Sequence, residues 1–426
     1  MRLQVKKQKG NLNVIIKIRK EEGPIRFLAF LLNWNVITGI IESMARLPGL
    51  SFLSGFSNIT VVFSILFVGI SVLYTIGNSS NWKTYLLIIG WMFLFALSSL
   101  LNSGISPMTA RGFIYYANNV FCIAVLLQAM LDFNLLVEKL KKYIPITVLY
   151  AALQWMVGTG EDIYSMSFSY ATMVSMLLCL LLCIREKNNR VLNIIFFIVL
   201  LATNFRYGSR GSLVCCALLI VLNLALTAGK KKIKNIVIAM VGILAVGLYW
   251  ERILLMLQRL FPEARNVVIL SQRIMFYGSG REEIYGKVLE EILKSPLAIR
   301  GLYSDRVFLS GGSQNLDVLW GSYTHNIFLE CLYQWGIWCI PIIVTTAVWM
   351  IRLFLMTKGA DEATKIILIV VYTFAIGQLM ISSSYLIAPS FGLLVGFMLW
   401  GRRNRNRFSM IDDVSYGLIN EQKGSI

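Results

Sequence analysis

Charged residues are scarce in this sequence. Aspartate, glutamate, lysine and arginine make up 15% of its 426 residues, whereas hydrophobic residues make up 57% and the mean hydropathy is +0.68. A soluble protein of this length needs far more polar surface. Several apolar runs approach the roughly 20 residues that a helix needs to cross about 30 Å of hydrocarbon, and a β-barrel would show short alternating segments instead. The sequence therefore predicts an all-α, polytopic helical membrane protein.

Other common features are also absent. The seven cysteines lie in or beside apolar runs, with no CxxC pair and no accompanying His/Asp cluster, so we expect neither a disulfide framework nor a metal site. The N-terminus carries a basic stretch and nothing that resembles a cleavable signal peptide. Because no period of about 20–50 residues repeats, we treat 1–426 as a single integral membrane domain.

The apolar segments number about twelve. We expect these transmembrane helices near 27–45, 58–76, 84–102, 112–131, 144–160, 166–184, 191–206, 211–229, 236–250, 337–356, 366–385 and 387–400. The longest interval between them, 251–336, is the one long polar stretch, and it leads into the next span.

The distribution of basic residues predicts the orientation. With the N-terminus in the cytoplasm, 27 of the 40 lysines and arginines fall on the cytoplasmic side, including those of the basic tail 1–26 and of the C-terminal tail 401–426. Cytoplasmic loops of membrane proteins collect basic residues, and long loops are exempt from this rule. Both termini are then cytoplasmic and 251–336 is external. The same rule explains the net charge of +18 better than nucleic-acid binding does, and we expect no nucleic-acid partner.

The external loop contains two stretches with helical periodicity, 251–261 and 281–294. In the second, Ile284, Val288 and Ile292 share one face, with glutamates and lysines opposite. Such helices either lie on the membrane surface or cap the bundle.

His325 is the single histidine of the chain, and it lies where the polar loop gives way to apolar sequence. An imidazole with an unperturbed pKa near 6.5 is the natural proton acceptor at neutral pH. A hydrogen-bonded structural imidazole at the start of a helix is the competing interpretation. Thr324 and Asn326 are expected to cap that helix or orient the ring, and Glu330 to pair with His325 or an arginine.

Arginines accompany this histidine on the predicted external side. Outside the long loop these are Arg46, Arg111, Arg206 and Arg210, and the last two share a helix face at the outer end of one segment. Within the loop, Arg281 after GlySerGly is the best candidate for gripping an anion, because a guanidinium binds phosphate through two parallel hydrogen bonds. For a lone arginine, snorkelling at a helix end is the preferred interpretation, and Arg281 taken alone could equally well cap the helix that it starts.

Three motifs in this order resemble those of the O-antigen polymerase and ligase superfamily of bacterial envelope glycosyltransferases (Wzy-type polymerases and WaaL-type ligases). They are SerArgGly at 209–211, GlySerGlyArg with the following helix and SerPro at 278–296, and HisAsnIlePheLeuGlu with Gly336 at 325–336. The resemblance covers roughly 190–345. One departure is that Ala298IleArgGly follows SerPro, where the family tends towards a Gly-x-Gly turn.

The resemblance implies a glycosyltransferase that uses sugars on undecaprenyl diphosphate at the external face of the bacterial cytoplasmic (inner) membrane, with no cofactor and no metal. Arg210 and Arg281 would hold the diphosphate, and His325 would activate the acceptor hydroxyl. Its partners would be this lipid-linked oligosaccharide, membrane lipid, and flippase and chain-length regulator proteins. The residues expected to support these three are Arg206, Ser209, Asn326, Glu330 and Arg300.

Two other functions stay open on the sequence. A ligase that transfers glycan to lipid A-core shares the same motifs. A multi-span flippase or transporter of lipid-linked oligosaccharide suits twelve spans, but it would place ionisable residues at mid-membrane and show two related halves. Here the charges cluster towards one face and the two halves differ, which disfavours a transporter. Between polymerase and ligase we favour a repeat-unit polymerase for O-antigen, capsule or exopolysaccharide, because polymerases are the more diverse group.

Overall fold

The computed structural model describes residues 22–78, 107–130, 132–157, 165–186, 188–227, 248–262, 281–313, 315–381 and 383–404, with scattered residues at 90–101 and 237–268. These residues form helices, turns and loops, and no strand occurs among them. The all-α prediction is confirmed for this part of the chain.

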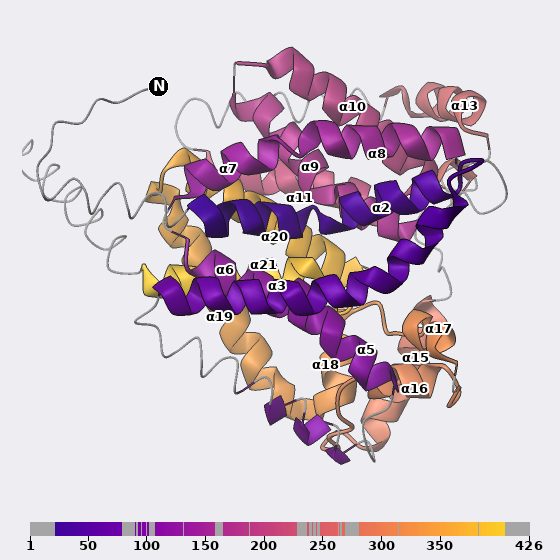
Figure 1. The fold of residues 1–426 in the computed structure, drawn as a ribbon, viewed down its shortest axis with the longest axis vertical. Helices are drawn as coiled ribbons and strands as arrows, with labels where there is room; N and C mark the ends of the chain where they lie inside the picture. Colours follow the sequence, from indigo (N-terminus) through magenta and orange to yellow (C-terminus); the bar gives the residue numbers. More distant parts are fainter. Residues whose placement is uncertain are drawn as a thin grey trace, which may run out of the picture.

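The main bundle contains helices of different lengths, most of which run side by side while some cross the others obliquely (Figure 1). They are Glu22–Leu32, α2 (Trp34–Ala45), α3 (Phe56–Asn78), α5 (Pro107–Tyr116), the π-helix η2 (Ala117–Cys122), α6 (Ile123–Gln128), α8 (Ile144–Val157), α9 (Met166–Arg185), α10 (Arg190–Tyr207), α11 (Arg210–Leu226), α19 (Ile340–Met356), α20 (Glu362–Ile381) and α21 (Pro389–Arg403). Short helices between them are η1 (Ser51–Gly55), α7 (Phe133–Lys141) and η4 (Thr357–Gly359). The segments expected near 84–102 and 236–250 lie largely outside the described residues.

Four helices in the described ranges are long and apolar enough to cross a membrane, and a fifth joins them if one pair bent by 47° counts as a single span. The four are Met166–Arg185, Arg190–Tyr207, Ile327–Gly359 and Glu362–Ile381, and the bent pair is Glu22–Leu32 with Trp34–Ala45. A membrane-compatible helical bundle is thus present, and the number of twelve spans stays a prediction.

Helices α9 and α20 form the centre of the bundle. Each is 78% buried over its most apolar window, whereas α10 is 28% buried and turns apolar side chains outward. Close approach at the centre depends on small residues: a β-carbon at Gly377 of α20 would overlap Sγ of Cys215 in α11. Small residues let neighbouring backbones approach in this way in membrane helix pairs.

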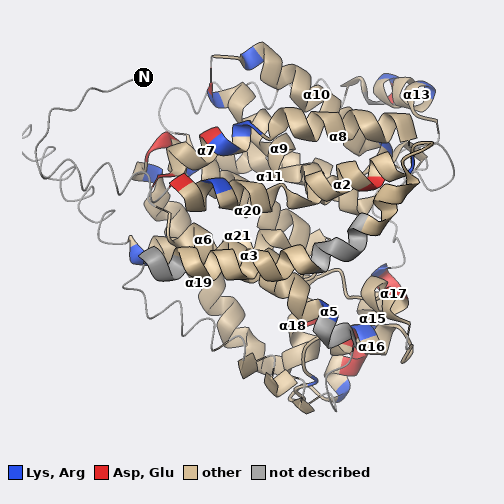
Figure 2. Cartoon of the chain, in the orientation of Figure 1, with Lys and Arg blue, Asp and Glu red and all other residues tan. Residues whose placement is uncertain are grey.

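Charged side chains gather at the two ends of the bundle, with uncharged sequence between them (Figure 2). At one end, Lys139 Nζ lies 3.0 Å from Glu22 Oε1, and Lys141 Nζ lies 2.7 Å from Glu186 Oε1. These residues belong to the side predicted to be cytoplasmic. The opposite end carries the helices of the long loop.

The long loop contains α13 (Trp250–Leu260), α15 (Arg281–Lys294), α16 (Ser304–Leu309) and α17 (Leu316–Gly321). Val288 and Ile292 of α15 are buried against Tyr333 of α18 (Ile327–Trp335), which comes after α17. The predicted helix at 281–294 and its apolar face are confirmed, and α15 caps α18.

Helix α18 begins at Ile327, although the sequence placed the start of this span at Ile337. Buried polar side chains on α18, including Glu330 and Gln334, lower its apparent hydrophobicity and explain the difference. After α18 the chain turns through the 3-10 helix η3 (Gly336–Cys339), with Gly336 at φ 61°. A β-carbon on Gly336 would lie 2.6 Å from the carbonyl oxygen of Pro296, so only glycine fits where the SerPro turn contacts α18.

Candidate functional site

His325 lies in the loop between α17 and α18. Directly after it, Asn326 caps α18, its Oδ1 accepting hydrogen bonds from the amides of Phe328 (2.9 Å) and Leu329 (3.3 Å). The backbone of His325 has φ 55°, in the left-handed region that residues other than glycine rarely adopt. Backbone conformations of this kind cluster at functional sites, where the surrounding structure holds them.

His325 is half-buried, and its imidazole packs against an aromatic ring. Its centroid lies 3.9 Å from that of Tyr323, with the two ring planes tilted by 44°. Nδ1 is buried and has no hydrogen-bond partner among the described residues. Burial, followed by the positive charges of Arg281 and Arg306, lowers the pKa of His325 to about 4. The imidazole is therefore neutral at pH 7.

Arg281 is the first residue of α15, and it reaches across to the bundle. Its Nη1 donates a hydrogen bond of 2.5 Å to the carbonyl oxygen of Ile381, the last residue of α20. A helix C-terminus carries partial negative charge and attracts a cation. The same guanidinium is near enough to His325 to lower the pKa of that residue. The structure thus brings together two of the three residues that the motifs singled out.

The third motif residue, Arg210, starts α11. A β-carbon on the adjacent Gly211 would lie 3.5 Å from Cγ2 of Ile381, so the start of α11 packs against the residue that binds Arg281. The Arg210 side chain lies outside the described residues. Ser209 is buried: its amide donates to Ser169 Oγ (2.5 Å), and its own Oγ has no partner within the described chain.

Arg306 and Asp305 lie next to the site, and the sequence analysis did not select them. Both are 0% exposed. Arg306 Nη1 donates to the carbonyl oxygen of Trp320 (2.5 Å), and the guanidinium lies 4.9 Å from the centroid of Tyr323. Its Nε and Nη2, like Oδ2 of Asp305, are buried without a partner in the described ranges. Burial raises the pKa of Asp305, and the charge of Arg306 opposes that rise.

Glu330 belongs to a buried polar network rather than to a direct pair with His325. Ser384 Oγ donates to its Oε1, and the amide of Tyr385 donates to its Oε2 at 3.3 Å. Gln334 links this carboxylate to the loop, because its Nε2 donates both to Glu330 Oε1 at 3.5 Å and to Asp305 Oδ1 at 2.8 Å. The network connects α16, α18 and the segment after α20.

Two of the residues expected to support the site serve as structural contacts. Arg206 lies in the last turn of α10 and Arg210 starts α11, so the expectation that the two share one helix face was wrong; the chain leaves the helix at Gly208 between them. The guanidinium of Arg206 lies 4.5 Å from the ring centroid of Trp155 in α8. Arg300 donates to the carbonyl oxygens of Glu291 (2.9 Å) and Tyr333 (3.3 Å) and so fastens α15 to α18. The turn that carries Arg300 therefore connects these two helices.

A signal for Arg306 was present in the sequence, although weak. The loop holds seven arginines and two lysines, and Arg306 follows an aspartate and lies among aromatic residues. Nothing in the local pattern distinguishes it from the exposed arginines of the loop, because its burial depends on Trp320 and Tyr323 folding over it.

The arrangement combines a neutral imidazole, a guanidinium held at a helix end, and buried carboxyl groups that receive hydrogen bonds. It can accept a proton from a hydroxyl group and can stabilise an anion beside it. No group of three or more His, Cys, Asp or Glu residues is placed to hold a metal ion in the part of the chain that the structure describes.

Comparison with protein-family models, with curated proteins and with solved structures finds no match for this chain. The residues and their geometry therefore carry the functional argument.

Proposed function

We propose that this protein is a metal-independent glycosyltransferase that polymerises undecaprenyl-diphosphate-linked oligosaccharide repeat units. It acts at the external face of a bacterial cytoplasmic membrane and builds O-antigen, capsule or exopolysaccharide. The observation that carries the proposal is the proximity of the Arg281 guanidinium to the neutral imidazole of His325, at the end of the bundle that holds the long loop.

The chemistry follows from these two groups. His325 accepts the proton of an acceptor sugar hydroxyl, and the hydroxyl oxygen attacks the anomeric carbon of the donor. The bond from that carbon to the diphosphate oxygen breaks, and undecaprenyl diphosphate leaves with its electron pair. Arg281, together with Arg210, stabilises the negative charge of the leaving group. Neither a metal ion nor a nucleotide takes part.

The low pKa of His325 fits this sequence of events. In the free protein, burial and two nearby arginines keep the imidazole unprotonated. A bound diphosphate offsets the positive field of Arg281 and Arg306, so the affinity of His325 for a proton rises when substrate arrives. The base is then strongest when the reaction needs it.

The deciding experiment incubates the purified protein, in lipid bilayers, with undecaprenyl-diphosphate-linked repeat units, both with and without lipid A-core. A ladder of longer lipid-linked glycans in the absence of lipid A-core supports the polymerase. Transfer that requires lipid A-core would make the protein a ligase. Movement of labelled lipid-linked sugar across vesicles, with no new glycosidic bond, would assign it to transport.

A further inference from the structure

We propose that a groove on the long loop binds the saccharide chain of the substrate, several sugars away from the reacting bond. The inference rests on the function proposed above for the class of its ligand. The groove has a volume of about 550 Å³ and lies between α15 and the segments around α16 and α17. This is within the range of roughly 300–1,000 Å³ that is typical of small-molecule sites.

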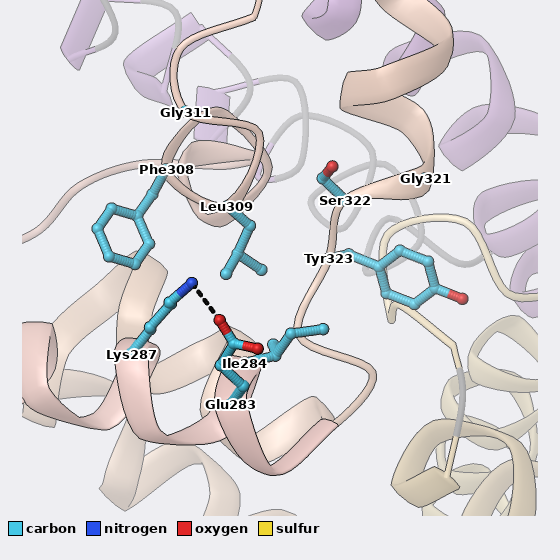
Figure 3. A pocket seen from close by; sticks show the side chains of 9 residues that line it. All are labelled: Glu283, Ile284, Lys287, Phe308, Leu309, Gly311, Gly321, Ser322 and Tyr323. Carbon is cyan, nitrogen blue, oxygen red and sulfur yellow. Dashed lines mark ion pairs between the residues drawn. The ribbon is translucent and has the colours of Figure 1, made fainter. Parts of the chain in front are cut away.

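The walls of the groove differ in chemistry. Glu283 and Lys287 of α15 form one wall, with Lys287 Nζ 2.6 Å from Glu283 Oε1. Phe308 and Leu309 face them from α16 (Figure 3). Gly311 and Gly321 contribute backbone without side chains, which leaves peptide groups accessible to a ligand.

A carbohydrate matches this lining. Sugar rings present apolar C–H faces that pack on an aromatic ring, and their hydroxyl groups donate and accept hydrogen bonds at the same time. The Glu283–Lys287 pair supplies an acceptor and a donor side by side. A phosphate is a poorer match because the ammonium of Lys287 is already paired with a carboxylate, and an acyl chain is poorer still because it would desolvate that pair.

The groove is continuous with the candidate catalytic site through Tyr323. The residue lines the groove, and its ring points away from Glu283 and Lys287 (Figure 3). That ring is the one that packs on His325, with centroids 3.9 Å apart. One end of a glycan bound in the groove therefore lies close to the imidazole. This is required if the bound chain extends from the reacting sugar.

Two pairs of variants test the groove. Glu283→Ala with Lys287→Ala removes the ion pair that lines it, and Glu290→Ala with Lys294→Ala removes the second (i, i+4) pair of α15, at 3.0 Å, outside the groove. Gly321→Trp fills the groove, since a β-carbon there meets nothing within 4 Å, and Gly286→Trp adds the same bulk to open space on α15. All four side chains of the ion pairs are well exposed, so their removal leaves the fold intact.

The first measurement is binding of the soluble oligosaccharide released by mild acid from the protein's own lipid-linked repeat units. We expect wild type and both control variants to bind it alike, and both groove variants to bind at least about tenfold more weakly. The second measurement is elongation, where KM for the lipid-linked unit rises in the groove variants and kcat changes little.

Each result bears on one proposal. Elongation by wild type, with binding and KM unchanged in both groove variants, would overturn the groove and leave the polymerase standing. Absence of saccharide binding to wild type would also overturn it. Saccharide binding that the groove variants lose, in a protein that forms no glycosidic bond, would support the groove and refute the polymerase.

Discussion

The ring of Tyr323 contacts both His325 and Arg306: its centroid is 3.9 Å from that of the imidazole and 4.9 Å from the central carbon of the guanidinium. A single aromatic side chain therefore contacts both the candidate base and a buried cation. Burial, Arg281 and Arg306 together lower the pKa of this imidazole.

Replacement of His325 with alanine is expected to abolish chain elongation while the protein still inserts into the membrane. Loss of a general base typically costs about 10²–10⁴ in rate. Elongation is measured by the length of lipid-linked glycan, and insertion by the amount of detergent-extracted, folded protein. Full-length polymer made by this variant would remove the role of base from His325.

On the acid side, kcat/KM and kcat for elongation should fall at two different pH values. Only neutral imidazole accepts a proton, so activity falls as pH drops through the pKa of His325. In kcat/KM, which reports the free protein, the limb is expected near pH 4. In kcat, which reports the substrate complex, it should lie higher because the bound diphosphate offsets the arginine charges. Coincident limbs near pH 6.5 would show that burial and the arginines do not perturb this group.

The Arg281→Lys variant should elongate glycans much more slowly than wild type, although the substitution keeps the positive charge. Arg281 donates to the carbonyl oxygen of Ile381, and its planar guanidinium can hold that carbonyl and an anion in one fixed geometry. A lysine ammonium cannot do both, and loss of such anion stabilisation costs about 10²–10³ in kcat. Arg259→Lys, on the exposed side of α13, is the matched control and should elongate like wild type. Equal rates for the two variants would mean that a point charge suffices at Arg281.

Arg306→Met should destabilise the fold, and adding Asp305→Asn should recover part of the loss. Removing one member of a buried charged group leaves the other uncompensated, which costs about 3–5 kcal/mol. Asp305 is 0% exposed and has this guanidinium as a neighbouring charge. Thermal unfolding of the two variants tests the prediction. In the double variant the acid limb of kcat/KM should also move up, because one of the charges that lowers the pKa of His325 is gone.

The two charged ends of the bundle should differ in their access to a membrane-impermeant thiol reagent. In intact cells, a cysteine at the exposed Glu290 of α15 is expected to react, and one at the exposed Glu138 of α7 to react only after the membrane is opened. Variants in which the native cysteines are replaced remove the background. Labelling of Glu138→Cys but not of Glu290→Cys in intact cells would invert the topology.

Much of the fold was predictable because it depends on local pattern. The apolar face of α15 repeats at helical spacing, and its bounds at Arg281 and Lys294 agree with the sequence. The start of α18 was not predictable from hydropathy, since Glu330 and Gln334 are polar and become buried only through partners near Ser384. Hydropathy averages along the chain cannot anticipate hydrogen bonds that arrive from another helix.

The sequence by itself determined the helical, membrane-compatible character of the chain, the helix that Arg281 starts, and the choice of His325, because composition, periodicity and rarity are properties of a linear string. Tertiary structure alone decided that Arg281 would reach Ile381, that Arg300 would connect α15 to α18, and that Arg306 would be buried beside the imidazole. The physical reason is that burial and charge act through space. Whether an arginine stays at the surface or becomes a buried neighbour of His325 depends on the aromatic side chains that cover it, here Trp320 and Tyr323 over Arg306.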